Sequence, residues 1–199
     1  MSKAILYIHG KGGSSKEIEQ IKPFCSGYDV LGIDLVDFTP WGTEKQIQSA
    51  FEMLKRKYDR VSIVGNSIGA YFSMFALQNR PVEKAFFISP ILDMERLIFD
   101  MMTWANVTEE ELKEQRTIQT DFGETLSWEY LTFVREHPID WKTPTEILYA
   151  EHDNMTLQKT VDYFVSSHQA NLTVMPNGEH WFHTPEQIAF MGNWLISVC

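Results

Sequence analysis

The hydrophobic positions of the chain fall into short runs of strand length, separated by longer segments with helical spacing. Six of these runs are rich in isoleucine, valine, leucine and phenylalanine and do not alternate cleanly with polar residues. Such runs are typical of strands that are covered on both faces of a sheet. They span residues 4–8, 29–35, 60–64, 84–89, 145–150 and 171–175. Strands alternating with helices predict an α/β protein with a mainly parallel sheet and right-handed crossovers.

Helices are predicted between the early strands and near the end of the sequence. The early ones span roughly residues 14–24, 43–58 and 67–79. Thr43 and Gln46, at the start of the second of these, have the spacing of a capping box. The last helix is expected to follow Thr184, with Pro185 in its first turn and Gln187 completing another box. Helices on both faces of the sheet would give three layers.

Residues 91–143 break the alternation, because they contain no convincing strand. Helical stretches are predicted near residues 93–105, 108–117 and 124–136. We expect this segment to be a helical insertion over one edge of the sheet. The 199 residues suit one domain, so we expect residues 1–199 to form a single domain that carries the insertion.

The charge of the chain narrows the choice of partners. Lysine and arginine number 17 against 27 aspartate and glutamate residues, which gives a formal net charge of −10. An acidic surface repels phosphate backbones and anionic lipid headgroups. We therefore expect neither nucleic acid nor a membrane surface to be a partner.

The two cysteines, Cys25 and Cys199, form no CxxC pair and no disulfide framework, which fits a reduced, intracellular setting. The apolar run before His9 is too short for a signal-peptide core or a spanning helix. We expect a soluble, cytoplasmic protein.

The third predicted strand runs into the sequence Gly65-Asn66-Ser67-Ile68-Gly69, which matches the pattern G-x-S-x-G. Between a strand and a helix, this pattern forms a sharp turn that holds the serine hydroxyl in the open. The helix N-terminus then lies beside the position where negative charge develops on a substrate. The alternative is an ordinary glycine-rich connection without a chemical role.

A glycine-rich loop, His9 to Ser15, follows the first predicted strand. It matches neither the P-loop nor the dinucleotide-binding pattern. Next to the serine, its backbone can supply an oxyanion donor, for which the amide of Lys11 is the best candidate, with the amide of Ile68 as the second. His9 precedes the turn, so we interpret it as a structural hydrogen-bonding residue rather than a base.

An acid and a histidine follow the last two predicted strands. Asp153 lies just past residues 145–150, at the end of the sheet where the sites of parallel α/β proteins collect. Asp93 is the rival acid. His180 is favoured over His183, which abuts the predicted helix cap. The two histidines have no third ligand at a meaningful spacing, so no metal is expected.

The motifs HGKGG, GNSIG, EHDNMT and NGEHWFH together resemble those of serine hydrolases of the α/β-hydrolase superfamily, over nearly the whole chain. The resemblance implies Ser67 as nucleophile, His180 as base and Asp153 as the acid that orients the base. It also implies an oxyanion hole formed by the amides of Lys11 and Ile68. The fold would be a small, three-layer α/β-hydrolase fold of about six strands, with the insertion where members of the superfamily carry a cap.

These roles predict hydrolysis of carboxylic esters of small or medium, partly apolar acyl groups through an acyl-enzyme, without a cofactor. Phe38 and Trp41, with Trp104 and Trp128 from the insertion, either line the acyl pocket or only pack the insertion onto the sheet. Amide, thioester and lactone substrates use the same triad and stay open. So does a protein that binds a small molecule in such a pocket without turnover.

Overall fold

The computed structural model describes residues 1–199. The chain divides into two compact units. The larger unit comprises Met1–Leu92 and Asp140–Cys199, and the smaller unit comprises Asp93–Ile139. The smaller unit is therefore an insertion between two parts of the larger one.

The larger unit is built on a 6-stranded sheet in which every neighbouring pair of strands is parallel. The strands are β1 (Lys3–Ile8), β2 (Asp29–Ile33), β3 (Arg60–Asn66), β4 (Ala85–Ile88), β7 (Thr145–Ala150) and β8 (Ala170–Met175). Their order across the sheet is β2-β1-β3-β4-β7-β8. All the strands predicted from the apolar runs are present, and the prediction of a parallel sheet is confirmed.

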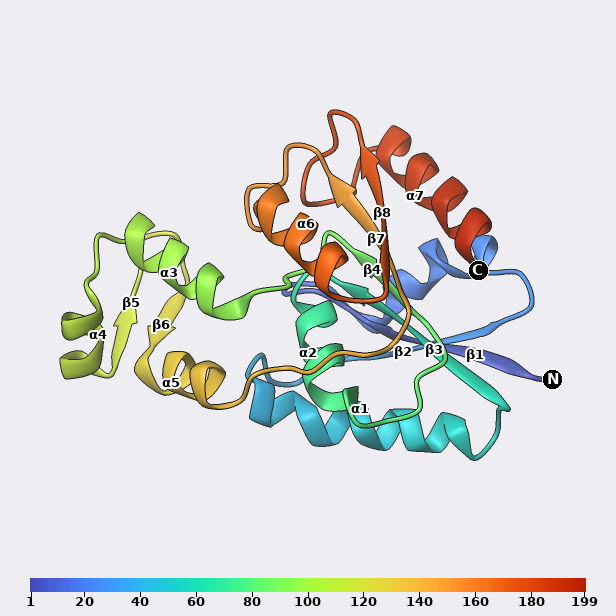
Figure 1. Ribbon diagram of the computed structural model, residues 1–199, viewed down its shortest axis with the longest axis horizontal. Coiled ribbons are helices and arrows are strands. Elements are labelled where there is room, and N and C mark those ends of the chain that lie inside the picture. The colour runs from blue at the N-terminus through green and yellow to red at the C-terminus, as the bar shows by residue number, and fades with distance from the viewer. The chain divides into compact units, whose positions relative to one another are not determined.

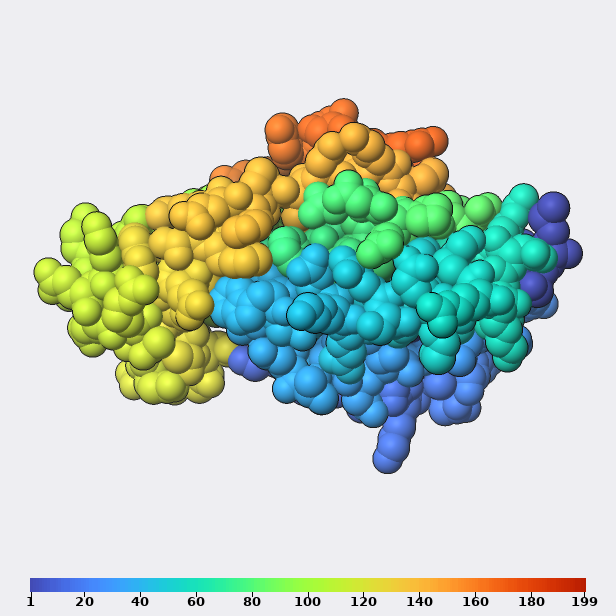
Figure 2. All heavy atoms as spheres, turned by 90° about the horizontal axis from the view of Figure 1, so that it is seen from below, coloured from blue at the N-terminus to red at the C-terminus, as the bar shows by residue number.

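Helices cover both faces of this sheet. They are η1 (Ser15–Gln20), η2 (Lys22–Phe24), α1 (Pro40–Lys55), α2 (Ile68–Leu77), α6 (Gln158–Ser167) and α7 (Pro185–Val198). In Figure 1, α1 and α2 pack together on one side, while α7 and η2 pack together on the other. The reversal of strand order after β2, with right-handed crossovers, places the two groups on opposite faces. Figure 2 looks onto the first face, where the atoms of α1 (light blue to cyan) form the middle of the visible surface.

The core lies between these layers and the central strands. On one side, Ile5, Val64, Phe86 and Leu148 from four neighbouring strands are buried in one apolar cluster with Trp194 of α7. Strands that are buried on both faces need no alternation of polar and apolar residues, which explains the continuous apolar runs of the sequence. The core thus fixes the strand register on which the positions of the loops depend.

The start of α1 differs from the prediction. The helix begins at Pro40, and its N-cap is Thr39, whose hydroxyl accepts from the amide of Gly42. Thr43 is buried inside the helix, and its hydroxyl donates to the carbonyl of Thr39 over 2.9 Å. The predicted cap at Thr43 is therefore wrong, because Pro40 is already suited to the first helical position. Gln46 instead donates to the carbonyl of Asp34.

Two other segments depart from the predicted helices. Residues 14–24 form two short 3-10 helices, η1 and η2, instead of one regular helix. Helix α6 was not predicted, because only Val161 and Phe164 are buried among its ten residues. The capping box of α7 at Thr184 and Gln187 is present as predicted. No helix of the protein has the length and apolar character needed to cross a membrane.

The smaller unit contains helices and a β-hairpin. Its elements are α3 (Met94–Trp104), α4 (Glu109–Gln115), β5 (Thr117–Gln119), β6 (Thr125–Ser127) and α5 (Trp128–Glu136). The strands β5 and β6 pair antiparallel. The prediction that residues 91–143 lack strands is therefore wrong, and the predicted helix at 124–136 begins later, after Ser127 caps α5.

Candidate active site

The carboxyl ends of parallel strands bring three predicted site residues to one edge of the sheet. Ser67 follows β3, Asp153 follows β7, and His180 lies in the loop after β8. The Oγ of Ser67 lies 2.8 Å from Nε2 of His180. The Nδ1 of His180 lies 2.7 Å from Oδ2 of Asp153. The three side chains therefore form one hydrogen-bonded series, although they come from distant parts of the sequence.

The turn at Ser67 holds the backbone in a conformation that residues with side chains rarely adopt. Ser67 has φ 53° and ψ −121°, between the end of β3 and the start of α2. Its amide donates to the carbonyl of Ile88 (2.9 Å), and its carbonyl accepts from the amide of Ile91 (3.1 Å). Gly69 is needed because a Cβ there would collide with the carbonyl oxygen of Ile8. The backbone conformation of Ser67 costs on the order of 1–3 kcal/mol, so the surrounding contacts must stabilise it.

The loop from His9 to Ser15 packs directly against this turn. A Cβ on Gly10 would lie 3.2 Å from the Cβ of Ser67, so the loop backbone runs beside the serine. His9 is buried, with Nδ1 2.7 Å from the carbonyl of Gly10, and its Nε2 accepts from the amide of Leu35 at 2.9 Å. Nδ1 therefore carries the proton, since Nε2 is the acceptor. These bonds agree with the structural role expected of His9.

A second set of hydrogen bonds that holds the glycine-rich loop in place was not predicted. The carboxylate of Glu17 accepts from the hydroxyl of Tyr7 and, over 3.2 Å, from the amide of Ser14. Burial first, and then the hydrogen bond to Glu17, raise the pKa of Tyr7 far above its ordinary value, which keeps this hydroxyl protonated as a donor. The capping-box spacing of Ser14 and Glu17 was the available sequence signal.

Asp153 is fixed from both of its oxygens. Its side chain is 0% exposed, and while Oδ2 faces His180, Oδ1 accepts from the amides of Met155 (2.8 Å) and Thr156 (2.9 Å). The hydroxyl of Thr156 in turn donates to the carbonyl of Pro90 over 2.9 Å. Burial raises the pKa of Tyr149, which donates to the carbonyl of Thr156, to about 12, with a smaller contribution from the charge of Asp153. The carboxylate therefore has little freedom to turn.

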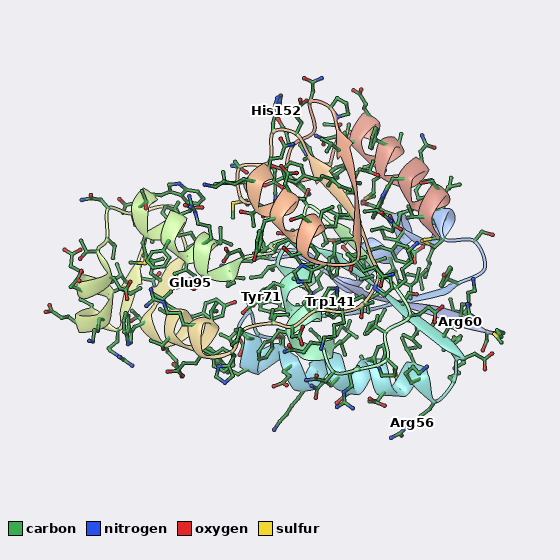
Figure 3. The ribbon with its side chains drawn as sticks, viewed as in Figure 1. Arg56, Arg60, Tyr71, Glu95, Trp141 and His152 are labelled. Carbon is green, nitrogen blue, oxygen red and sulfur yellow. The ribbon has the colours of Figure 1, made fainter.

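The loop that carries His180 is tied to the loop of Asp153. The amide of His152 donates to the carbonyl of Gly178 over 2.9 Å, and His152 is labelled in Figure 3. His183 takes a different position: its Nδ1 lies 2.7 Å from the carbonyl of Trp181, and its ring stacks on Trp181 at 4.5 Å. Of the two histidines, His180 is the one beside Ser67. No group of three or more His, Cys, Asp or Glu side chains gathers where a metal ion would be held.

The rival acid, Asp93, has another role in the structure. It is the N-cap of α3, and its Oδ1 accepts from the amide of Arg96 over 2.9 Å. A carboxylate at this position stabilises a helix N-terminus. Asp93 opens the smaller unit, whereas Asp153 is the acid that contacts His180.

The four candidate pocket aromatics divide between the two units. In the larger unit, the ring of Phe38 lies 5.9 Å from that of His9, and Trp41 is in the first turn of α1. In the smaller unit, the ring of Trp104 lies 6.1 Å from that of Phe122, edge to face. The ring of Trp128 lies beneath the amine of Lys113 at 5.8 Å. Phe38 thus lies beside His9, the first residue of the glycine-rich loop.

Solved hydrolases share this architecture at low sequence identity. Alpha/beta hydrolase domain-containing protein 10 from mouse superposes with a TM-score of 0.78 at 14% identity, covering 98% of this chain and 88% of that one. Est1E from Butyrivibrio proteoclasticus gives 0.78 at 15% identity, with 98% and 85% covered. An esterase from Pyrococcus furiosus gives 0.68 at 18% identity, with 99% and 80% covered.

These similarities define the fold of the chain. No family model matches the sequence, and no curated protein matches it either. The superposition covers nearly all of this chain in each of these structures. The protein has the α/β-hydrolase fold, and the predicted fold class is confirmed.

Proposed function

We propose that this protein is a serine hydrolase that cleaves carboxylic esters through an acyl-enzyme. The observation that carries the proposal is the hydrogen-bonded series in which Ser67 Oγ lies 2.8 Å from His180 Nε2, and His180 Nδ1 lies 2.7 Å from Asp153 Oδ2. A nucleophile, a base and a group that orients the base are the parts that nucleophilic catalysis requires. The fold shared with esterases and other hydrolases supports the same reading.

In this proposal Ser67 attacks the carbonyl carbon of the ester. Nε2 of His180 takes the hydroxyl proton during the attack and then gives it to the leaving alcohol. Asp153 keeps the proton of the neutral imidazole on Nδ1, so that Nε2 is free to accept, and its charge stabilises the imidazolium. Water then attacks the acyl-enzyme, with the same histidine as the base. The mechanism needs no cofactor.

We assign the oxyanion hole to the backbone amides of Lys11 and Ile68. Ile68 is the first residue of α2, and the first amides of a helix have no acceptor within the helix. The close approach of Gly10 to Ser67 supports the placement of the neighbouring Lys11 amide beside the reacting carbon. Each such donor contributes on the order of 3–4 kcal/mol to the stabilisation of the transition state.

The proposed substrates have small or medium, partly apolar acyl groups. Phe38 supports an apolar pocket wall, because its ring contacts both His9 and Phe72 next to the site. We assign Trp41 to the same pocket. A small-molecule ester of a cytoplasmic pool is the expected partner.

A substrate panel tests the proposal. p-Nitrophenyl esters of rising acyl length, with matched amides and thioesters, are assayed with the wild type and with Ser67→Ala. We expect the wild type to turn over the esters fastest and the variant to lose this activity. Faster turnover of the matched amide or thioester would replace the ester assignment. A folded wild type that binds these compounds but turns over none of them would instead support a binding protein.

A further inference from the structure

The two cysteines of the chain meet in the fold, although 174 residues separate them. Cys25 directly follows η2 and is 1% exposed, inside the apolar core cluster. Cys199 directly follows α7 and packs against the same cluster. Their sulfur atoms lie 3.0 Å apart, with a hydrogen bond between the thiols. Neither residue belongs to the proposed catalytic site.

The surrounding structure holds the two sulfurs close to bonding distance. The S–S bond length is about 2.05 Å, so the sulfurs need to approach by roughly 1 Å. The elements on which the cysteines sit are in contact. Their packing is tight, because a Cβ on Gly192 of α7 would lie 2.6 Å from the ring of Phe24 in η2. The two cysteines are therefore held next to each other by the packing of the elements that precede them.

The two thiols differ in their surroundings. The hydrogen bond from Cys25 lowers the pKa of Cys199; burial opposes this shift, and the positive charges of Lys84 and Lys3 add to it. The amine of Lys84 lies near this point, since it donates to the carbonyl of Val198 over 3.1 Å. The same hydrogen bond and burial raise the pKa of Cys25. Cys25 is buried and Cys199 is half-buried, so Cys199 is the thiol that a disulfide in solution reaches first, and the attacking species in the exchange is its thiolate.

We propose that Cys25 and Cys199 form a reversible disulfide by exchange with a small disulfide of the glutathione class. The Cys199 thiolate attacks one sulfur of oxidised glutathione and releases one glutathione thiolate, which leaves a mixed disulfide on Cys199. Cys25 then loses its proton and attacks the Cys199 sulfur, forming the internal bond and releasing the second glutathione. The two cysteine sulfurs are oxidised, and one glutathione disulfide is reduced to two thiols.

The bond would join the segment after β1 to the helix after β8, and so close almost the entire chain into a loop. A cross-link over so long a loop strongly restricts the unfolded chain. We expect the oxidised form to unfold at a temperature higher by on the order of 10 °C than the reduced form.

The test is a redox titration of the full chain. The protein is equilibrated in buffers of varying reduced-to-oxidised glutathione ratio, quenched with acid, alkylated and weighed intact. We expect conversion to a species that has lost the two thiol hydrogens and takes up no alkylating agent, with a digest that links the Cys25 and Cys199 peptides. A wild type that stays a dithiol at the most oxidising ratio, or that only accumulates glutathione, would overturn the proposal.

Two variants test the order of the steps. Cys25→Ala lacks the second thiol, so we expect it to retain glutathione on Cys199 where the wild type forms the internal bond. In Cys199→Ala, the buried Cys25 should stay unmodified in native buffer. Glutathionylation of Cys25 as fast as that of Cys199 would contradict the assigned order. The linked peptide of the wild type is read independently of either variant and of any hydrolase activity.

Discussion

The two units of this chain each bury apolar side chains, but they differ in their polar interactions. In the larger unit, strands buried on both faces share one apolar cluster, and long-range hydrogen bonds join the loops at their carboxyl ends. In the smaller unit, side chains cap the helices α3, α4 and α5, and Arg135 forms ion pairs with Glu95 and Glu109, each at 2.6 Å. Most of the smaller unit's polar contacts are local or exposed.

The contrast suggests a different role for each unit. The proposed catalytic side chains, which must lie within hydrogen-bond distance of one another, belong to the larger unit, where a buried sheet fixes the positions of distant residues. At the caps and exposed ion pairs of the insertion, sequence change is tolerated, because such contacts contribute about 1 kcal/mol or less each. Substitutions at the site should therefore abolish activity, whereas substitutions in the insertion should change stability by small amounts.

The largest expected effect separates the two histidines of the loop after β8. His180→Ala removes the base beside Ser67 and should lower kcat by about 10⁶-fold, as the loss of a triad histidine does elsewhere. His183→Ala is the matched control, since His183 contacts Trp181 instead of Ser67, and it should stay within a few-fold of the wild type. Ester kinetics with both variants measure the difference, and the reverse result would assign the base to His183.

The next effect separates the two acids. Asp153→Asn keeps the shape of the side chain but loses the charge that orients His180, so kcat should fall by about 10⁴-fold. Asp93→Asn removes only the charge of a helix cap in the smaller unit, and asparagine caps nearly as well, so kcat should hardly change. Equal activity losses in the two variants would break the assignment of Asp153.

A pair of glycines tests how tightly the site is packed. Gly69→Ala adds a Cβ that collides with the carbonyl oxygen of Ile8, and it should lower the free energy of unfolding by about 3 kcal/mol. Gly12→Ala meets no atom within 4 Å and has only its φ of +76° against it, so the cost should be about 1 kcal/mol. Urea unfolding measures both. Equal costs would contradict the close approach of the turn to β1.

The smallest effect concerns the smaller unit. Thr108 and Glu111 form a complete capping box at the start of α4, and Thr108→Ala should cost about 1 kcal/mol. Thr103→Ala is the control, because its exposed hydroxyl bonds only to the carbonyl of Phe99 one turn back, and it should be nearly neutral. Hydrogen exchange of the α4 amides follows the change locally. Unchanged exchange in Thr108→Ala would show that contacts other than the cap hold α4.

The sequence predicted the sheet well, because every strand is a continuous apolar run bounded by polar residues. It also predicted which side chains meet, since parallel strands end at one edge and Ser67, Asp153 and His180 each follow a strand. The hairpin of β5 and β6 was not predicted, because strands of only three residues are too short to give a recognisable apolar pattern. The cap of α1 was misplaced because Thr39 and Thr43 both suit a cap, and Pro40 decides between them.

Other contacts between distant residues could not be predicted. Nothing local in the sequence relates Cys25 to Cys199, or Thr156 to Pro90, because these pairs depend on how helices and loops pack on the finished sheet. The tether between Glu17 and Tyr7 had a local signal on one side only, the spacing from Ser14. Tyr7, Glu17 and Thr156 hold the loops of the site. Their partners can be recognised only once the strands are in register.

Covalent labelling of Ser67 tests the central claim most directly. The wild type and Ser67→Ala are treated with a fluorophosphonate and weighed intact, and the modified peptide is sequenced. An activated serine attacks this phosphorus, so we predict one adduct, located on Ser67 and missing from the variant. A folded wild type that stays unlabelled, or that is labelled elsewhere, would contradict the assignment of Ser67, His180 and Asp153 as a nucleophilic triad.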